Sequence, residues 1–299
     1  ETYPDHPGAN KQPFFFTTPR RRSNQVVLPY QQRFVEKILA HTLKYGHVLY
    51  CMDNETNGEE AWGRYWARFI KERAATAGKT VCVTEMWDDW NLASSMHKRT
   101  FDHPELYDFV DVSQNTHVRG RENWDRFLQV REYLKAKPRP MNTTKIYGSD
   151  GNKFGDTAQD GIERFWRHLL AGAASVRFHR PDAGLGMSNK AVAAIHAARK
   201  LESKIPLWSV TPADDLLSEC EPNEAYAAAA PGQAYAVYFP AGGGRVTLNM
   251  PGVEDGFDLY WIDIDAGEWG AEEQVDIEEA VELEAPGKGN WAAALVKRL

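Results

Sequence analysis

From residue 30 to about 205, the chain alternates short apolar runs with amphipathic helix patterns, and this alternation constrains the fold more than any other feature. In the clearest helix, apolar residues recur on one face, at Trp62, Tyr65, Trp66, Phe69 and Ile70. Other helices are predicted at 31–45, 121–135, 162–170 and 188–203, and strands at 47–53, 80–85, 109–114, 141–147 and 174–179. Strands and helices in alternation are typical of βα units with a parallel sheet.

Polar residues follow each predicted strand, which favours an α/β fold of the barrel type. We expect a partial TIM-like (β/α) barrel of about five βα units, with an open doubly wound sheet as the alternative. No glycine-rich phosphate loop follows any of the strands, which disfavours the nucleotide-binding form of the open sheet. A closed barrel has eight strands and usually about 250 residues, so this one would be incomplete. Residues 1–29, which contain five prolines, are predicted to form an extended arm.

After Pro206 the pattern changes to short alternating runs separated by glycine-rich turns. The predicted strands are 225–230, 233–239, 245–249, 258–263, 275–283 and 291–297. This pattern indicates an all-β domain, a small antiparallel β-sandwich. The expected domains are therefore 1–208 for the barrel and 209–299 for the sandwich.

Composition narrows the classes of function. The net charge of −7 disfavours a nucleic-acid surface, and no run of about 18 apolar residues predicts a membrane span. Three cysteines without metal-like spacing predict neither a disulfide framework nor a metal site, and no cofactor is expected. The ten tryptophans favour a carbohydrate ligand, because aromatic rings pack on sugars. A targeting signal would not be visible in a chain that starts at Glu1, and the expected location is secreted or periplasmic.

Two carboxylates follow neighbouring strands. Asn54 and Glu55 end the first apolar run, and Glu85 ends the second. Because neighbouring strands lie about 4.8 Å apart, two such carboxylates can reach the separations of about 5 to 9.5 Å that glycosidases use. Glu55 is the leading candidate for a general acid. The competing interpretation of Glu85 is a structural ion pair with a residue such as Arg177.

Other side chains at the strand ends fit a polyhydroxylated ligand, because amides, imidazoles, guanidinium groups and aromatic rings can all contact sugars. The candidates for substrate binding are Asn54, Trp87, Trp90, Gln114, Asn115, His117, Tyr147, Arg177 and His179. Taken singly, each of them is more often structural, and Trp87 and Trp90 could equally pack within a loop. The recurrence of these residues at strand ends is what indicates a binding site.

The pair Asn54-Glu55 after an apolar strand resembles the acid/base motif at the end of the fourth strand in the clan of retaining (β/α)8 glycoside hydrolases, clan A. More narrowly, the chain is similar to apiosidase-like glycosidases, in which a collagen-binding-type β-sandwich follows the barrel. Residues 259–267, which contain Tyr260 and Trp261, resemble a strand and turn of that sandwich. The resemblance implies that Glu55 is the acid/base and that Asn54 contacts the sugar 2-hydroxyl.

The resemblance also implies that the five predicted strands are the fourth to the eighth of the barrel. The nucleophile of the clan would then follow the run 141–147, where this chain has no carboxylate. Thr143 and Thr144 stand there, and a hydroxyl does not replace a carboxylate without an added base. Asp150 and Asp156 lie downstream as possible substitutes.

We therefore expect a glycoside hydrolase that cleaves a plant or microbial polysaccharide by a two-carboxylate mechanism. Glu55 would be the acid/base, and Glu85 would be the nucleophile or the base that activates water. One alternative is a non-catalytic carbohydrate-binding remnant of a glycosidase. Another is half of an oligomeric barrel in which a second copy covers the open sheet edges.

Overall fold

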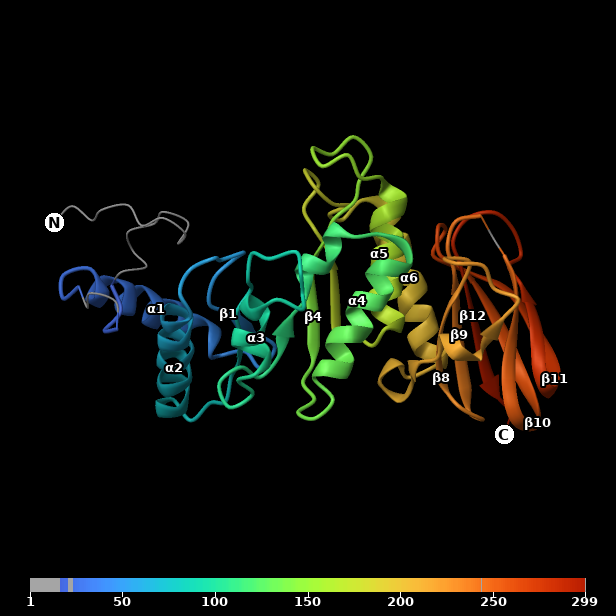
Figure 1. Ribbon diagram of the computed structural model, residues 1–299, viewed down its shortest axis with the longest axis horizontal. Coiled ribbons are helices and arrows are strands. Elements are labelled where there is room, and N and C mark those ends of the chain that lie inside the picture. Colours follow the sequence, from blue (N-terminus) through green and yellow to red (C-terminus); the bar gives the residue numbers. More distant parts are fainter. Residues whose placement is uncertain (1–16, 21–23, 243, 299) are drawn as a thin grey trace. The chain divides into compact units, whose positions relative to one another are not determined.

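The computed structural model of the protein describes residues 17–20, 24–242 and 244–298, and Figure 1 shows its course. The chain forms two compact units, the first with residues 1–114 and 130–142 and the second with 115–129 and 143–299. Most of the predicted arm lies outside the described residues. The first helix begins inside the predicted arm, at Leu28.

The first unit holds the early βα elements. They are α1 (Leu28–Thr42), β1 (Leu49–Cys51), α2 (Glu60–Thr76), β2 (Cys82–Thr84), α3 (Ser95–Phe101), β3 (Val110–Asp111) and the beginning of β4 (Met141–Ile146). β1 pairs in parallel with β2, and β3 pairs in parallel with the first residues of β4. Asp108 links β2 to β3, because its carboxylate accepts a hydrogen bond from the Val83 amide while its own amide donates to the Val83 carbonyl.

Side-chain alternation along β1 and β2 gives the sheet one covered face. Tyr50 and Val83 pack in one apolar cluster with Ala67 and Ile70 of α2. Their neighbours on each strand point to the opposite face, since successive side chains alternate, and Leu49 is 56% exposed there. That opposite face is covered at Thr84 of β2, which is 1% exposed.

The helix α3 was not predicted, because the sequence indicates only a surface loop after β2. Ser94 caps this helix, with its hydroxyl accepting a hydrogen bond from the Met96 amide at 3.3 Å. A helix of seven residues is too short to show a clear apolar period, which explains the miss.

The second unit continues the alternation. It contains the end of β4, α5 (Ala158–Leu170), β5 (Ser175–Phe178) and α6 (Asn189–Lys204). The 3₁₀ helix η2 (Ser113–His117) and the helix α4 (Gly120–Tyr133) each have residues in both units. β5 lies next to β4, and the ring of Phe178 stacks on Phe165 of α5 at 4.6 Å between ring centres. These elements complete the five predicted βα units within the described residues.

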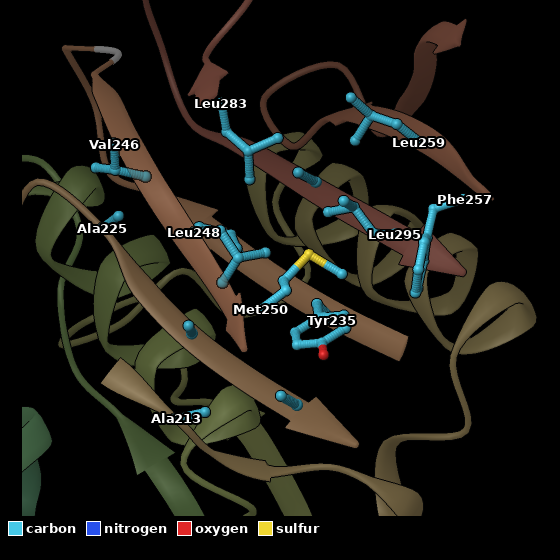
Figure 2. Packing of buried hydrophobic residues seen from close by; sticks show 14 of the residues in the cluster. Ala213, Ala225, Tyr235, Val246, Leu248, Met250, Phe257, Leu259, Leu283 and Leu295 are labelled. Atoms are coloured by element: carbon cyan, nitrogen blue, oxygen red, sulfur yellow. The ribbon is translucent and has the colours of Figure 1, made fainter. Parts of the chain in front are cut away.

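The C-terminal strands form one antiparallel sheet of seven strands in the described part of the chain. They are β6 (Thr211–Pro212), β7 (Leu217–Ser218), β8 (Tyr226–Ala230), β9 (Ala234–Phe239), β10 (Arg245–Asp263), β11 (Glu268–Glu284) and β12 (Trp291–Lys297), with 3₁₀ turns η3 (Leu207–Ser209) and η4 (Asp214–Leu216) before and after β6. Its core gathers Leu248 and Met250 of β10 with Tyr235 of β9 and Leu295 of β12, as Figure 2 shows. The expected fold class, a partial barrel followed by an antiparallel β-domain, is confirmed.

Two predicted strands, 245–249 and 258–263, are one long strand in the structure. The Pro251-Gly252 pair indicated a turn, yet β10 continues through it with a register shift between Asn249 and Glu254. A bulge accommodates proline because the extra residues need not donate to the ladder. The prediction of two separate strands at 245–249 and 258–263 was therefore wrong.

Helix α5 packs directly on the C-terminal sheet. The ring of Trp166 stacks on Tyr238 at 5.6 Å, and the amide side chains of Gln159 and Asn290 exchange hydrogen bonds of 2.8 and 2.9 Å. The predicted boundary near residue 208 lies between the end of α6 and the start of β6. Because of these contacts, residues on both sides of it belong to the same compact unit.

Candidate functional site

The segment from Asp53 to Glu55 bulges away from the sheet. The Met52 amide donates to the Thr84 carbonyl at 3.1 Å, and the Thr56 amide donates to the Met86 carbonyl at 2.9 Å. Between these two hydrogen bonds, the segment after β1 advances by four residues and the segment after β2 by two. The first segment therefore contains two extra residues, and bulges of this kind change the direction of side chains. Both predicted residues of the motif, Asn54 and Glu55, lie in this bulge at the carboxyl end of β1.

Glu55 has a left-handed backbone, with φ of +48°. This region is unfavourable for a residue with a Cβ and costs about 1 to 3 kcal/mol. The paired amides of Met52 and Thr56 on either side hold it in place. Backbone conformations of this kind cluster at active sites, and Glu55 is half-buried while Asn54 beside it is exposed.

Asp53 adds a carboxylate that the sequence argument did not single out. It is half-buried, and burial raises its pKa, although the Asn54 amide donates to its Oδ1 at 2.8 Å and favours the ionised form. Its position next to Asn54-Glu55 at the end of an apolar run was the signal that could have found it.

Glu85 lies in the same region but is only 1% exposed. Neither of its carboxylate oxygens accepts a well-formed hydrogen bond from the residues that the structure describes. A Cβ placed on Gly63 of α2 would lie 2.2 Å from its Oε2 and 3.5 Å from the Tyr107 hydroxyl, so the carboxylate faces the helix. Burial, followed by the charge of Asp53, raises its pKa well above the ordinary value. In this arrangement Glu85 does not reach a surface that a sugar could touch.

The acidic groups form a cluster at the carboxyl ends of β1, β2 and β3. Burial raises the pKa of the Cys51 thiol, and the charges of Glu85, Asp111 and Asp53 add to the effect. Asp111 is held by its neighbour Ser113, whose amide and hydroxyl both donate to it at 2.9 Å. Among the described residues, no group of three or more His, Cys, Asp or Glu side chains has the arrangement of a metal site.

The two predicted tryptophan platforms differ. Trp87 is 2% exposed, and its indole N–H donates to the Thr100 hydroxyl at 2.7 Å, so it packs in the core and leaves no ring face for a sugar. Trp90 is 59% exposed, as a platform requires. The sequence could not separate them because the missed helix α3 is what covers Trp87.

The predicted amides after β3 are buried. Gln114 is 3% exposed. Asn115 has no exposed surface, and its side-chain amide donates to the Asn123 carbonyl at 2.7 Å and lies 2.9 Å from the His168 ring. Asn115 therefore anchors η2 to α4 and α5, and this placement leaves no group to meet a sugar.

In the second unit, aromatic rings gather at the ends of β4 and β5. Tyr147 stacks on Phe154 with ring centres 5.2 Å apart, and it lies 5.0 Å from His179 and 5.7 Å from His117. Three of these four were predicted. Phe154 was missed, because a single phenylalanine in a loop carries no pattern.

Basic side chains accompany these rings. Arg177 is exposed, and its guanidinium donates to the Thr144 carbonyl at 3.3 Å. Burial lowers the pKa of His179, and the charges of Lys145, Arg180 and Arg177 lower it further.

The residues that could have replaced the nucleophile are engaged elsewhere. Thr143 contacts the buried His168 ring at 3.2 Å, and burial lowers the pKa of that histidine to about 3. Asp150 forms an ion pair with Lys190 at 3.3 Å, and Asp156 forms ion pairs with Arg119 and Arg164.

The structure resembles solved glycoside hydrolases. It matches a family 5 glycoside hydrolase from Bacteroides vulgatus ATCC 8482 with a TM-score of 0.63 at 10% identity, over 89% of this chain and 66% of the other. A second glycoside hydrolase matches with a TM-score of 0.64 at 10% identity, over 89% and 68%. A family 30 endoxylanase from Clostridium papyrosolvens C71 matches at 0.52 and 12% identity, over 90% and 71%.

The fold is glycosidase-like. The chain spans about two thirds of the length of the first two structures that it matches. No protein-family model matches the sequence, and no curated protein does. Among the described residues, no helix is both long and apolar enough to cross a membrane.

Proposed function

We propose that this chain acts on glycosidic bonds, with Glu55 as the general acid/base. The observation that carries the proposal is the bulge at residues 53–55, which holds Glu55 in a left-handed conformation at the carboxyl end of β1 in a glycosidase-like fold. Catalytic residues of such barrels come from the carboxyl ends of strands. The exposed amide of Asn54 beside it is suited to hydrogen-bond a sugar hydroxyl.

The second carboxylate of the proposed mechanism comes from the acidic cluster. Glu85, the residue that the sequence favours, lies too deep to attack a sugar carbon in this arrangement, and burial and the charge of Asp53 raise its pKa, which favours its neutral form. Asp53 is the more accessible carboxylate of the two. We therefore assign Asp53 the role beside Glu55, with Glu85 as a buried neighbour whose raised pKa favours its neutral form.

The test is hydrolysis of a panel of polysaccharides and aryl glycosides, with the anomeric form of the products followed by NMR. Glu55→Gln should lower the rate at least about 100-fold, because general acid catalysis contributes that much. Glu132→Gln, which alters an exposed carboxylate at the end of α4, is the matched control.

Two further variants separate the roles of the other carboxylates. Asp53→Asn should lower the rate as strongly as Glu55→Gln, whereas Glu85→Gln should shift the pH dependence more than the rate. Full activity of Glu55→Gln on a substrate that the unaltered chain cleaves would contradict the proposal. Retention or inversion at the anomeric carbon then says whether the second carboxylate attacks carbon or activates water.

A non-catalytic carbohydrate-binding role is the second candidate. Thr143 and Thr144 lie in the strand that carries the nucleophile in the clan of retaining (β/α)8 glycoside hydrolases. The absence of a carboxylate in this strand favours a binding role. Calorimetry that detects oligosaccharide binding, with no product after long incubation, would support binding over catalysis.

A further inference from the structure

The rings at the ends of β4 and β5 form a fixed platform. Tyr147 is 7% exposed, whereas Phe154, which lies parallel to it with an angle of 4° between the ring planes, is 50% exposed. The buried ring thus holds the outer ring in place. A half-exposed aromatic ring of fixed orientation can pack against the C–H face of a sugar.

Positive charges surround this platform. The Lys153 ammonium lies 5.0 Å from the centre of the Phe154 ring. His179, whose ring lies 5.0 Å from Tyr147, is within the electrostatic reach of Lys145, Arg177 and Arg180. A neutral sugar does not need such a concentration of cations.

The nearby carboxylates have cations of their own. Asp182 pairs with Arg180 at 2.7 Å. In the loop after β4, Asp150 pairs with Lys190, and Asp156 pairs with Arg119 and Arg164. None of these ion pairs involves Lys153 or Arg177. Lys153 lies against the Phe154 ring and Arg177 of β5 stands two residues before His179, and these carboxylates do not cancel the charge of either cation.

We propose that Tyr147, Lys153, Phe154, Arg177 and His179 form an acidic-sugar site, which binds a sugar that carries an oxyanion. A guanidinium group matches the paired oxygens of a carboxylate or a sulfate ester, and its hydrogen bonds to an anion are stronger than those to a hydroxyl. The aromatic platform selects a sugar over a simple anion. The inference rests on the proposed function, and it names an acidic glycan as the class of substrate.

Binding, measured without hydrolysis, tests the acidic-sugar site. Titration calorimetry at low salt would compare trigalacturonic acid with its fully methyl-esterified form, which has the same sugars without the charges. We expect the acid to bind at least about 10-fold more tightly, since one charge-assisted hydrogen bond contributes about that factor. A sulfated galactose trisaccharide forms the second arm and identifies which oxyanion is preferred. If neither anionic sugar binds more tightly than the ester, the inference is overturned.

Variants assign the effect to the acidic-sugar site. Arg177→Gln should reduce the affinity for the preferred anion about 10-fold and leave the affinity for the ester unchanged, and Arg177→Lys should keep part of the charge-dependent affinity. Arg199→Gln, an exposed cation on α6, is the matched control. Equal affinities of Arg177→Gln and Arg199→Gln for the anion would overturn the assignment. If the chain binds the anionic sugar but hydrolyses no substrate in the panel, only the proposed catalysis is contradicted. Failure of the acidic-sugar site and failure of the proposed function are therefore distinguishable.

Discussion

The carboxyl ends of β1 and β2 and those of β4 and β5 have different surroundings. The first group brings together Asp53, Glu85 and the Cys51 thiol, and the protein surroundings raise the pKa of all three. The second group presents a half-exposed ring and exposed cations. Two sheet ends with similar patterns of polar and aromatic residues thus support different chemistry, because helix packing determines the solvent exposure of each one.

The comparison makes a general prediction. Substitutions of Glu85 and of the residues packed around it should change the free energy of unfolding, whereas substitutions of Asp53 and Glu55 should change the rate of hydrolysis. Substitutions in the acidic-sugar site should change ligand binding and leave stability nearly unchanged.

Trp87→Ala should destabilise the fold by about 3 to 5 kcal/mol, because it removes a fully packed indole and leaves the Thr100 hydroxyl without its donor. Trp90→Ala, at an exposed ring of the same segment, is the control and should change stability by less than about 0.5 kcal/mol. Urea unfolding measures both. Equal effects would show that Trp87 is not the core residue that its burial indicates.

Gly63→Ala should destabilise the fold by about 1 to 3 kcal/mol, because the new methyl group would lie 2.2 Å from Oε2 of Glu85. The double variant Gly63→Ala with Glu85→Ala should recover most of the Gly63→Ala loss. A double-mutant cycle with no coupling would mean that the Glu85 carboxylate does not face α2.

Glu85→Gln should flatten the decline of stability with rising pH. Because the pKa of Glu85 is higher in the folded than in the unfolded chain, unfolding releases a proton above about pH 4.5, and stability falls as pH rises toward the folded pKa. The slope from one such group is at most about 1.4 kcal/mol per pH unit. Asp53, whose pKa is also raised, contributes in the same direction, so part of the slope should remain. Urea unfolding from pH 4.5 to 8 measures it, and an unchanged slope in the variant would contradict the prediction.

Phe154→Ala should change stability by less than about 1 kcal/mol, because the ring is half exposed. It should weaken the binding of both charged and esterified oligosaccharides, since the platform acts on the sugar and not on its charge. Calorimetry beside thermal unfolding tests this. A large loss of stability with unchanged binding would show that Phe154 has a structural role and not a ligand-binding role.

Much of the fold could be predicted because the spacing of apolar residues along the sequence indicates which side chains are buried. All five predicted βα strands are present, and the helix of Trp62 and Trp66 is α2. Strand ends were predicted less well, since register and bulges depend on the partner strand. The continuation of β10 through Pro251 is one example, and the bulge at Glu55 is another.

For the site, the sequence supplied residue types and their order along the chain. It identified Asn54, Glu55 and Tyr147 at strand ends, yet it gave the same standing to Asn115 and Trp87, which are buried. A polar or aromatic residue after a strand has the same local pattern whether it meets solvent or a helix. Only the packing of α3, α4 and α5 separates these cases.

By itself, the sequence determined the class of fold, because apolar spacing of about 3.6 residues in helices and 2 in strands follows from backbone geometry alone. It also determined that Glu55 follows the end of a strand, although only Tyr50 of that strand is buried. The tertiary structure decided that Glu55 is held in a left-handed bulge, that Glu85 is buried against Gly63 and that Phe154 stacks on Tyr147. These features depend on contacts between residues far apart in the chain, which local patterns do not encode.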